Sequence, residues 1–150
     1  MGTYTHYAVI YDLWQSKDNV KRIDISDKLS RLNISRNFIQ VRNELYVYQN
    51  KAEENWFRLE GFNLPSGQTK KVSLTPVLQI LINRAFVNYH NTHIVASGGT
   101  MNGQQYGSVE VYDIMKQLWI GAPSLTEHRD KHVGCELGSH VYIAGGQRKV

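Results

Sequence analysis

Short runs in which apolar and polar positions alternate recur along the chain, and turn-forming residues separate them. The clearest succession follows Arg84, where β-branched and aromatic residues predominate, as they do in strands. Pro123 ends this succession, because proline cannot donate to a strand ladder. We therefore predict four short strands joined by turns: AFVNYH (85–90), THIVASGG (92–99), SVEVYDI (108–114) and QLWIGAP (117–123).

The third of these runs shows the two-residue period of a strand. Val109 and Val111 fall on one face, and Glu110 and Tyr112 fall on the other. Met115–Lys116 is the expected turn into the fourth run. Because each run is joined to the next by a short turn, the pattern predicts an antiparallel meander.

The pattern recurs at a nearly constant interval. Gly98–Gly99 and Gly145–Gly146 each end a strand-like run. Arg84 precedes the first pair and Arg129 precedes the second, and Arg36 precedes Arg84 by a similar distance along the chain. These intervals agree with a period of roughly 45–50 residues, which is typical of a four-stranded propeller blade.

This spacing divides the chain into four parts. Tyr48–Gln49 replaces the glycine pair in one of them, and VLQILIN (77–83) is expected to be a buried crossover between blades. About three blades do not close a ring, since propellers typically need 4–8. We therefore expect the remaining blades to come from a longer chain or from self-association. The expected parts are a partial blade (1–35), two blades (36–83 and 84–128) and a half blade (129–150).

These features resemble the kelch repeat, in which a strand ending in Gly-Gly, a strand ending in Tyr-Asp, a tryptophan and an arginine follow one another. The resemblance implies an all-β chain, a partial kelch-type β-propeller made of four-stranded antiparallel blades. It is best over residues 84–146, in Gly98, Gly99, Tyr112, Asp113, Trp119, Arg129, Gly145 and Gly146.

Each of these motif residues has a physical reason to be where it is. A glycine pair at a strand end permits positive φ angles and a close approach of the backbone. Tyr112 and Trp119 are expected to bury large areas between adjacent sheets. Arg129 is expected to donate hydrogen bonds to loop carbonyls through its planar guanidinium.

The resemblance implies a role in protein–protein interaction, as a scaffold, a cytoskeletal linker or the substrate-recognition part of a ubiquitin-ligase adaptor. In such propellers, one face is built from the loop after the glycine pair and the segment before the next blade. Here this face offers amide and guanidinium donors suited to an acidic or polar peptide. The alternative is a solvated loop without a partner. The candidate partner-binding residues are Arg36, Arg84, Thr100, Asn102, Gln104, Gln105, Tyr106 and Arg129.

Composition narrows the classes of function. The net charge is +4, but the positive residues are scattered, which does not favour nucleic-acid binding. No apolar run is long enough to span a membrane. Cys135 is the only cysteine, which excludes an intrachain disulfide and favours a reducing, cytoplasmic location. It lies in an apolar run, where a buried position is expected.

Catalytic and metal-binding signals are weak. His128 and His132, together with Glu127, have a spacing that binds metals on helices, but here the pattern predicts a loop entering a strand. We therefore expect no metal, no cofactor and no enzymatic activity. The alternative is a galactose-oxidase-like copper radical oxidase, which also resembles a kelch propeller. It requires a tyrosine–cysteine cross-link near the axis, and Cys135, placed within a strand, does not match that pattern.

Overall fold

The computed structural model describes six stretches of the chain, and every regular element in them is a β-strand, so the all-β prediction is confirmed. No helix in these stretches is long and apolar enough to cross a membrane. The chain divides into two units, residues 1–32 and residues 33–150. In the first unit, β1 (Tyr7–Ile10) pairs antiparallel with β2 (Lys21–Asp24). The described stretches are 7–10, 21–24, 37–51, 56–63, 69–71 and 81–148.

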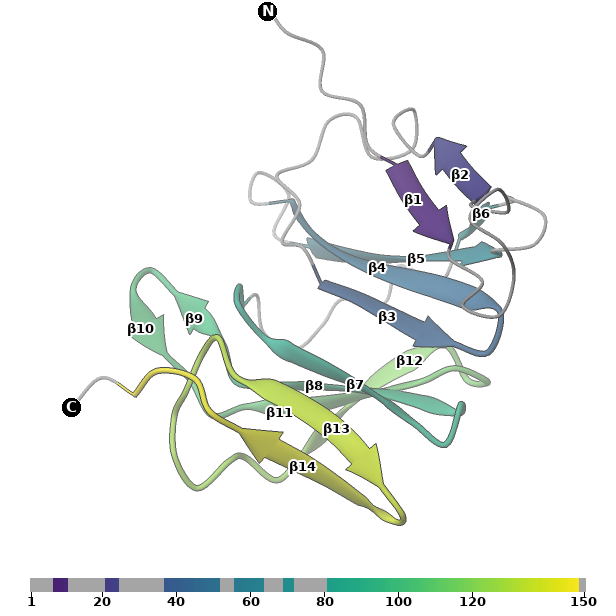
Figure 1. Cartoon of the computed structure of the whole chain (residues 1–150). Coiled ribbons are helices and arrows are strands. Elements are labelled where there is room, and N and C mark those ends of the chain that lie inside the picture. Colours follow the sequence, from purple (N-terminus) through teal and green to yellow (C-terminus); the bar gives the residue numbers. More distant parts are fainter. Residues whose placement is uncertain are drawn as a thin grey trace, which may run out of the picture. The chain divides into compact units, whose positions relative to one another are not determined.

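The four strands predicted after Arg84 form one antiparallel sheet of the second unit (Figure 1). They follow one another across the sheet as a meander, with Tyr112 opposite Ile94 on one side and Trp119 on the other. The loop after the glycine pair holds a further short hairpin that the sequence pattern did not predict, made of β9 (Thr100–Met101) and β10 (Gln104–Gln105). The four strands of the sheet are β7 (Ala85–Tyr89), β8 (His93–Ser97), β11 (Val109–Asp113) and β12 (Leu118–Ala122).

Two further antiparallel sheets complete the second unit. The first has four strands in sequence order, and the second is a two-stranded hairpin near the C-terminus. Most of the predicted crossover at 77–83 lies outside the described residues. The strands are β3 (Asn37–Val41), β4 (Glu44–Lys51), β5 (Trp56–Asn63) and β6 (Thr69–Lys71), followed by β13 (Val133–Leu137) and β14 (His140–Ala144).

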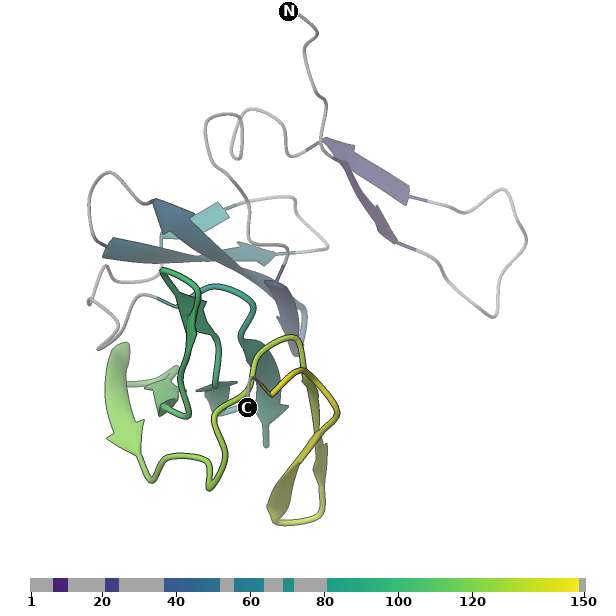
Figure 2. The same cartoon turned by 90° about the vertical axis from the view of Figure 1, so that its left-hand side faces the viewer.

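The first strands of the three sheets lie next to one another. They begin at Asn37, Ala85 and Val133, so the same interval along the chain separates each from the next. Strand β7 contacts both β3 and β13, while the later strands of each sheet lead away from this line of contact (Figures 1 and 2). The blades of a β-propeller follow one another in this way, so we call the three sheets blades. Among the described strands, the blades do not form a closed ring.

A glycine permits the close contact between β7 and β13. A Cβ atom on Gly134 would lie 2.5 Å from Cγ2 of Val87 and 3.0 Å from Cδ1 of Ile143. Carbon atoms in contact prefer about 3.5–4.0 Å. A larger residue at position 134 therefore forces either the Val87 side chain or β13 itself to shift.

The apolar core joins the two four-stranded sheets. Val41 and Tyr46 come from the first sheet, and Ile94 and Tyr112 come from the second. Tyr112 is fully buried, and burial raises its pKa to about 12. Its ring lies 5.2 Å from that of Trp119, centroid to centroid, at a tilt of 50°. Trp119 is partly buried against this core, so both aromatic residues bury area between the sheets, as the sequence predicts.

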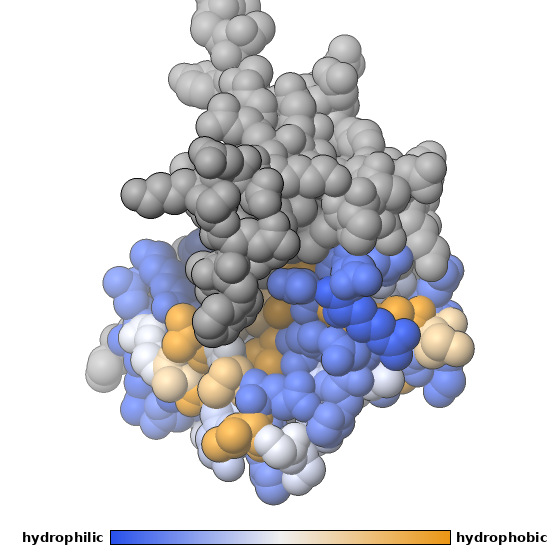
Figure 3. All heavy atoms as spheres, turned by 45° about the vertical axis from the view of Figure 1, so that its right-hand side comes forward, coloured by the Kyte–Doolittle hydropathy of each residue, from blue (hydrophilic) through white to orange (hydrophobic). Residues whose placement is uncertain are grey.

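The predicted burial of Cys135 is wrong. Its side chain is exposed, because the two-residue period of β13 turns it to the face opposite Gly134, away from β7. Val133 and Leu137 share this outer face and are each 68% exposed. Elsewhere the surface is mixed: on the face shown in Figure 3, hydrophobic residues form separate patches among hydrophilic ones.

Polar contacts join the hairpin tips of successive blades. The amide of Asn88 donates to the carbonyl of Gln40 (2.9 Å), and the backbone N–H of Arg42 donates to the side-chain oxygen of Asn91 (3.3 Å). Each bond connects residues that lie about one blade period apart in the sequence. These two bonds therefore hold the second blade against the first, and they join residues that are separated by about the same interval as the first strands of the two blades.

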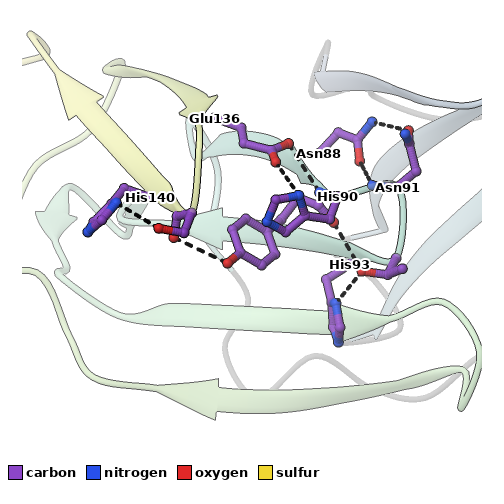
Figure 4. Close-up of polar contacts among 9 residues, drawn as sticks. Asn88, His90, Asn91, His93, Glu136 and His140 are labelled. Atoms are coloured by element: carbon purple, nitrogen blue, oxygen red, sulfur yellow. Dashed lines mark hydrogen bonds and ion pairs between the residues drawn. The ribbon is translucent and has the colours of Figure 1, made fainter.

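The next pair of blades is joined in the same region (Figure 4). Glu136 accepts from the backbone N–H of His90 (3.1 Å) and pairs with its Nδ1 (2.8 Å). The hydroxyl of Tyr89 donates to the carbonyl of Ser139 (3.2 Å). These hairpin tips form one end of the stack of blades, which we call the hairpin end.

We predict that Gly134→Ala lowers the free energy of unfolding by about 1–3 kcal/mol, because the added methyl overpacks the contact with Val87. Val87→Ala alone costs about 1–3 kcal/mol through the cavity that it leaves. Together, the two changes should cost clearly less than the sum of the single effects, since one makes room for the other. Denaturant titration of the four proteins measures this coupling, and strictly additive effects would show that the two residues do not touch.

Candidate functional site

The sequence-predicted binding residues gather at the end of the blades opposite the hairpin end. Strand β7 begins here, β8 ends here, and the β9–β10 hairpin and the C-terminal stretch lie beside each other (Figure 1). We call this end the loop face and define it as residues 98–107, 125–132 and 145–148. Arg36, the first of the predicted arginines, lies outside the described residues.

The first glycine pair brings three chain segments together. Gly98 and Gly99 have φ angles of +58° and +117°, as expected for a glycine pair at a strand end. A Cβ on Gly98 would lie 2.4 Å from the carbonyl oxygen of Arg129, and one on Gly99 would lie 2.8 Å from that of Ile82. Neither position has room for a side chain.

The second glycine pair has the same backbone conformation as the first, and its second member has matching surroundings. Gly145 and Gly146 also have positive φ angles, +70° and +86°. A Cβ on Gly146 would lie 2.5 Å from the carbonyl oxygen of Asp130. Asp130 forms an isolated bridge with Gln147, just as Ile82, one blade period earlier, bridges Thr100. Gly99 and Gly146 therefore perform the same task in successive blades, which is to let the chain that enters the blade cross the strand end at close range. Gly98 and Gly145 differ, because a Cβ on Gly145 would meet no atom within 4 Å.

Arg84 is an interior residue. Its side chain has no exposed area, and its guanidinium pairs with Glu110 and donates to the carbonyls of Ala96 (3.1 Å) and Ser108 (3.4 Å). Glu110 is only 1% exposed and lies on the same face of β11 as Tyr112. The pair thus ties the start of the first strand to the third strand of the same sheet. In this structure the Arg84 side chain is not exposed to a partner. Arg84 therefore belongs to the interior of the sheet and not to the predicted binding face.

Arg129 is not the structural counterpart of Arg84. Arg84 comes directly before β7, and the residue directly before β13 is His132, one full blade period later. Arg129 lies three residues earlier, in the loop. The sequence alignment of the two arginines therefore paired a core position with a loop position. The positive φ angles of Asn83 (+57°) and Lys131 (+55°) mark the correct alignment.

His132 occupies this position with a different partner. Its Nε2 lies 2.9 Å from the hydroxyl oxygen of Ser97, and the residue is 5% exposed. Burial and, next, the nearby Arg129 guanidinium hold its pKa below the ordinary value. A buried histidine that shares a hydrogen bond with a serine of the preceding blade has a structural role. Within the described residues, no three His, Cys, Asp or Glu side chains are placed to hold a metal ion.

Arg129 lies at the surface of the loop face. Its guanidinium donates to the carbonyl of Gly145 (3.1 Å), as expected for a loop-binding arginine, and pairs with Glu127 (3.0 Å). Arg148 pairs with the other oxygen of Glu127 (3.1 Å). The side chains of Arg129 and Arg148 are 25% and 62% exposed. Two guanidinium groups therefore converge on one solvent-accessible carboxylate.

The predicted loop residues divide into exposed and buried members. Asn102, in the turn between β9 and β10, and Gln104 are exposed, while Thr100 and Tyr106 are half-buried. Gln105 faces inward, where its amide donates to the carboxylate of Asp130 and to the carbonyl of Gln147 (2.9 Å). Gln105, like Arg84, therefore belongs to the scaffold that holds this end together. The surface members of the predicted set are Thr100, Asn102, Gln104, Tyr106 and Arg129.

Asp113, the acidic member of the Tyr-Asp motif, also has a structural role. Its carboxylate accepts from the backbone N–H groups of Lys116 and Met115, both at 2.9 Å. The bond from Lys116 is the largest cause of a lowered Asp113 pKa. The aspartate therefore caps the turn between β11 and β12, at the hairpin end.

Signals for two missed residues were present in the sequence. Glu110 alternates with Tyr112 on the face that the core covers, and a charged residue on such a face implies a buried partner. Gly134 interrupts a strand-like run, which indicates a close backbone approach. Both features are explained by residues distant in sequence: Glu110 pairs with Arg84, and Gly134 lies against Val87.

The comparison with known proteins agrees with this geometry. Residues 83–126 match the Kelch motif. The matched segment contains the complete sheet from β7 to β12, so the resemblance is confirmed there and this sheet is consistent with a kelch blade. No curated protein matches the chain.

We predict that Glu110→Leu lowers the free energy of unfolding by about 3–5 kcal/mol, because it leaves the Arg84 guanidinium buried without its counter-charge. Replacing both residues with leucine should cost less than this single change, since no charge then remains buried. The matched surface control is Lys116→Gln, which removes the exposed charge of Lys116 from its pair with Asp113 (3.4 Å). Equal losses for the single and double leucine variants in thermal and chemical denaturation would contradict this role.

Proposed function

We propose that this chain, through its Kelch motif and loop face, is a protein-binding module that acts as a scaffold or as a substrate-recognition adaptor. Its proposed role is to bind another protein in the cytoplasm, without catalysis and without a cofactor. The kelch blade supplies a rigid support, and the loops at its end supply the contacts. Binding residues are commonly carried on loops that a rigid scaffold positions.

The observation that carries the proposal is the pair of guanidinium groups on Glu127. Arg129 and Arg148 approach its two oxygens at 3.0 and 3.1 Å, and all three side chains reach solvent. A carboxylate from a partner can take a guanidinium from Glu127 at little cost, because exposed ion pairs are worth only about 0–1 kcal/mol. Planar, fork-shaped guanidinium groups favour a carboxylate as the incoming group.

The neighbouring β9–β10 hairpin adds neutral donors and acceptors. Asn102 and Gln104 expose their side-chain amides, and the hydroxyl of Tyr106 lies within 3.5 Å of the Gln104 side-chain oxygen. Amides beside guanidinium groups suit a polar peptide backbone with an acidic side chain. The proposed partner is therefore an acidic or polar peptide segment of another protein.

We expect the purified chain to select acidic peptides from a random-sequence display library. Arg129→Ala and Arg148→Ala should each weaken the selected peptide about tenfold, since each removes a charge-assisted hydrogen bond worth roughly 1.5–3 kcal/mol. The affinity is measured by calorimetric titration, and added salt should reduce it.

Lys116→Ala is the matched control. Lys116 is an exposed cation paired with an aspartate, as Arg129 is paired with Glu127, but it lies at the hairpin end. Its loss should leave peptide affinity unchanged. Selection of basic or purely apolar peptides, or equal weakening by Lys116→Ala, would overturn the assignment of the binding site to the loop face.

A further inference from the structure

The tip of the β9–β10 hairpin carries a chemically labile pair of residues. Asn102 and Gly103 form its two-residue loop, and Asn102 is the only asparagine of the chain that a glycine follows. Asparagine amides are among the thermally labile groups of proteins. A following glycine leaves the backbone nitrogen open to approach the amide, because glycine has no side chain that shields it.

The structure leaves this pair accessible. Asn102 and Gly103 are both exposed, and their φ angles of +51° and +77° are typical of a type I′ turn. A Cβ atom built on Gly103 would meet no atom within 4 Å. Water and base therefore reach the peptide bond between the two residues from outside.

Only the tip of the hairpin has to move before the two groups can react. At the base, Thr100 exchanges backbone hydrogen bonds with Ile82 (2.8 and 2.9 Å), and the side chain of Gln105 is buried. Beyond this base, Met101 and Gln104 form the single remaining pair of the hairpin. Short two-stranded hairpins are marginally stable. Opening this one pair therefore frees the turn to rotate while the base stays in place.

We propose that Asn102 is a site of spontaneous deamidation. The backbone nitrogen of Gly103 attacks the side-chain carbonyl carbon (Cγ) of Asn102, which closes a cyclic succinimide and breaks the Cγ–Nδ2 bond. The amide nitrogen leaves as ammonia, together with the proton of the Gly103 N–H. Water then opens the ring. Cleavage of the new N–Cγ bond gives aspartate, and cleavage of the original peptide bond gives isoaspartate.

Asn91 shows which features of Asn102 matter. It also has a positive φ angle (+54°) and an exposed position in a hairpin loop. However, its side-chain oxygen accepts from the backbone N–H of Arg42 (3.3 Å) and from the amide of Asn88 (2.8 Å). The residue after it is Thr92, whose β-branched side chain crowds the backbone nitrogen. Asn91 is therefore an internal control for the reaction.

Both products place a new carboxylate on the loop face. Asn102 is one of the exposed amides of the proposed peptide site, and isoaspartate also lengthens the main chain at the turn. A negative charge here repels an acidic partner segment and competes for the guanidinium groups of Arg129 and Arg148. This effect on binding rests on the proposed peptide-binding role of the loop face, whereas the reaction itself does not.

We expect the purified chain, kept folded at physiological temperature, to convert Asn102 to aspartate and isoaspartate. The reaction should be faster in mildly alkaline than in mildly acidic buffer, because the attacking nitrogen has to lose its proton. It should be less than about tenfold slower than in a free peptide of residues 99–107, since only one residue pair has to open. Tandem mass spectrometry locates the change, isoaspartyl methyltransferase detects isoaspartate, and circular dichroism monitors folding.

Asn102→Gly is the matched control, because Gly-Gly also favours the type I′ turn but carries no side-chain amide. This variant should accept no methyl group from the methyltransferase, and Asn91 of the wild-type chain should stay unchanged. Persistence of the Asn102 amide in the folded chain, while the free peptide converts, would overturn the proposal. Conversion of Asn91 at the same rate would overturn it as well.

The effect on binding is measured with an acidic peptide selected on freshly purified chain. Converted chain should bind this peptide up to about fivefold more weakly in calorimetric titration, and added salt should narrow the difference. Equal affinity of fresh and fully converted chain would contradict the effect on binding. Fresh chain that selects no acidic peptide would contradict the peptide-binding role and leave the deamidation site standing, so the two failures are distinguishable.

Discussion

The structure depends on one steric constraint, which is that the first strands of successive sheets must approach each other closely. Gly134 meets this constraint for β13, because a Cβ atom there would overlap a methyl group of Val87. Gly98 meets it at the end of β8, where it lies against the backbone carbonyl of Arg129, in the chain that enters the next sheet. The constant interval between first strands expresses the same requirement, since each blade has to return the chain to the same place.

The buried pair of Arg84 and Glu110 belongs to this arrangement, because it holds the inner strand of the kelch blade to its third strand. Gln105 and Asp130 fix the base of the loop face from inside, which leaves Asn102, Gln104 and Arg129 at the surface. Structural support and the proposed contacts are thus assigned to different residues of the same short segments.

The strands, their order and the glycine pairs could be predicted from the sequence, because alternation and turn residues are local signals. The burial of individual side chains could not be predicted in this way. Cys135 lies in an apolar run, yet β13 shows it to solvent, since nothing in the local pattern tells which face a neighbouring blade will cover. Arg84 and Arg129 look alike in sequence, but one is a core residue and the other a surface residue. The two arginines can be told apart only from the position of β13, which is set by its contact with β7.

The stacking of β13 on β7 is tested most directly by nuclear Overhauser spectroscopy on a sample with labelled valine methyl groups. The account predicts a strong cross-peak between the Val87 methyl protons and the α-protons of Gly134, because van der Waals contact places these groups within about 4 Å. If the Gly134 signals show contacts within β13 and β14 but none to Val87, the blades are not stacked through their first strands and the account is contradicted.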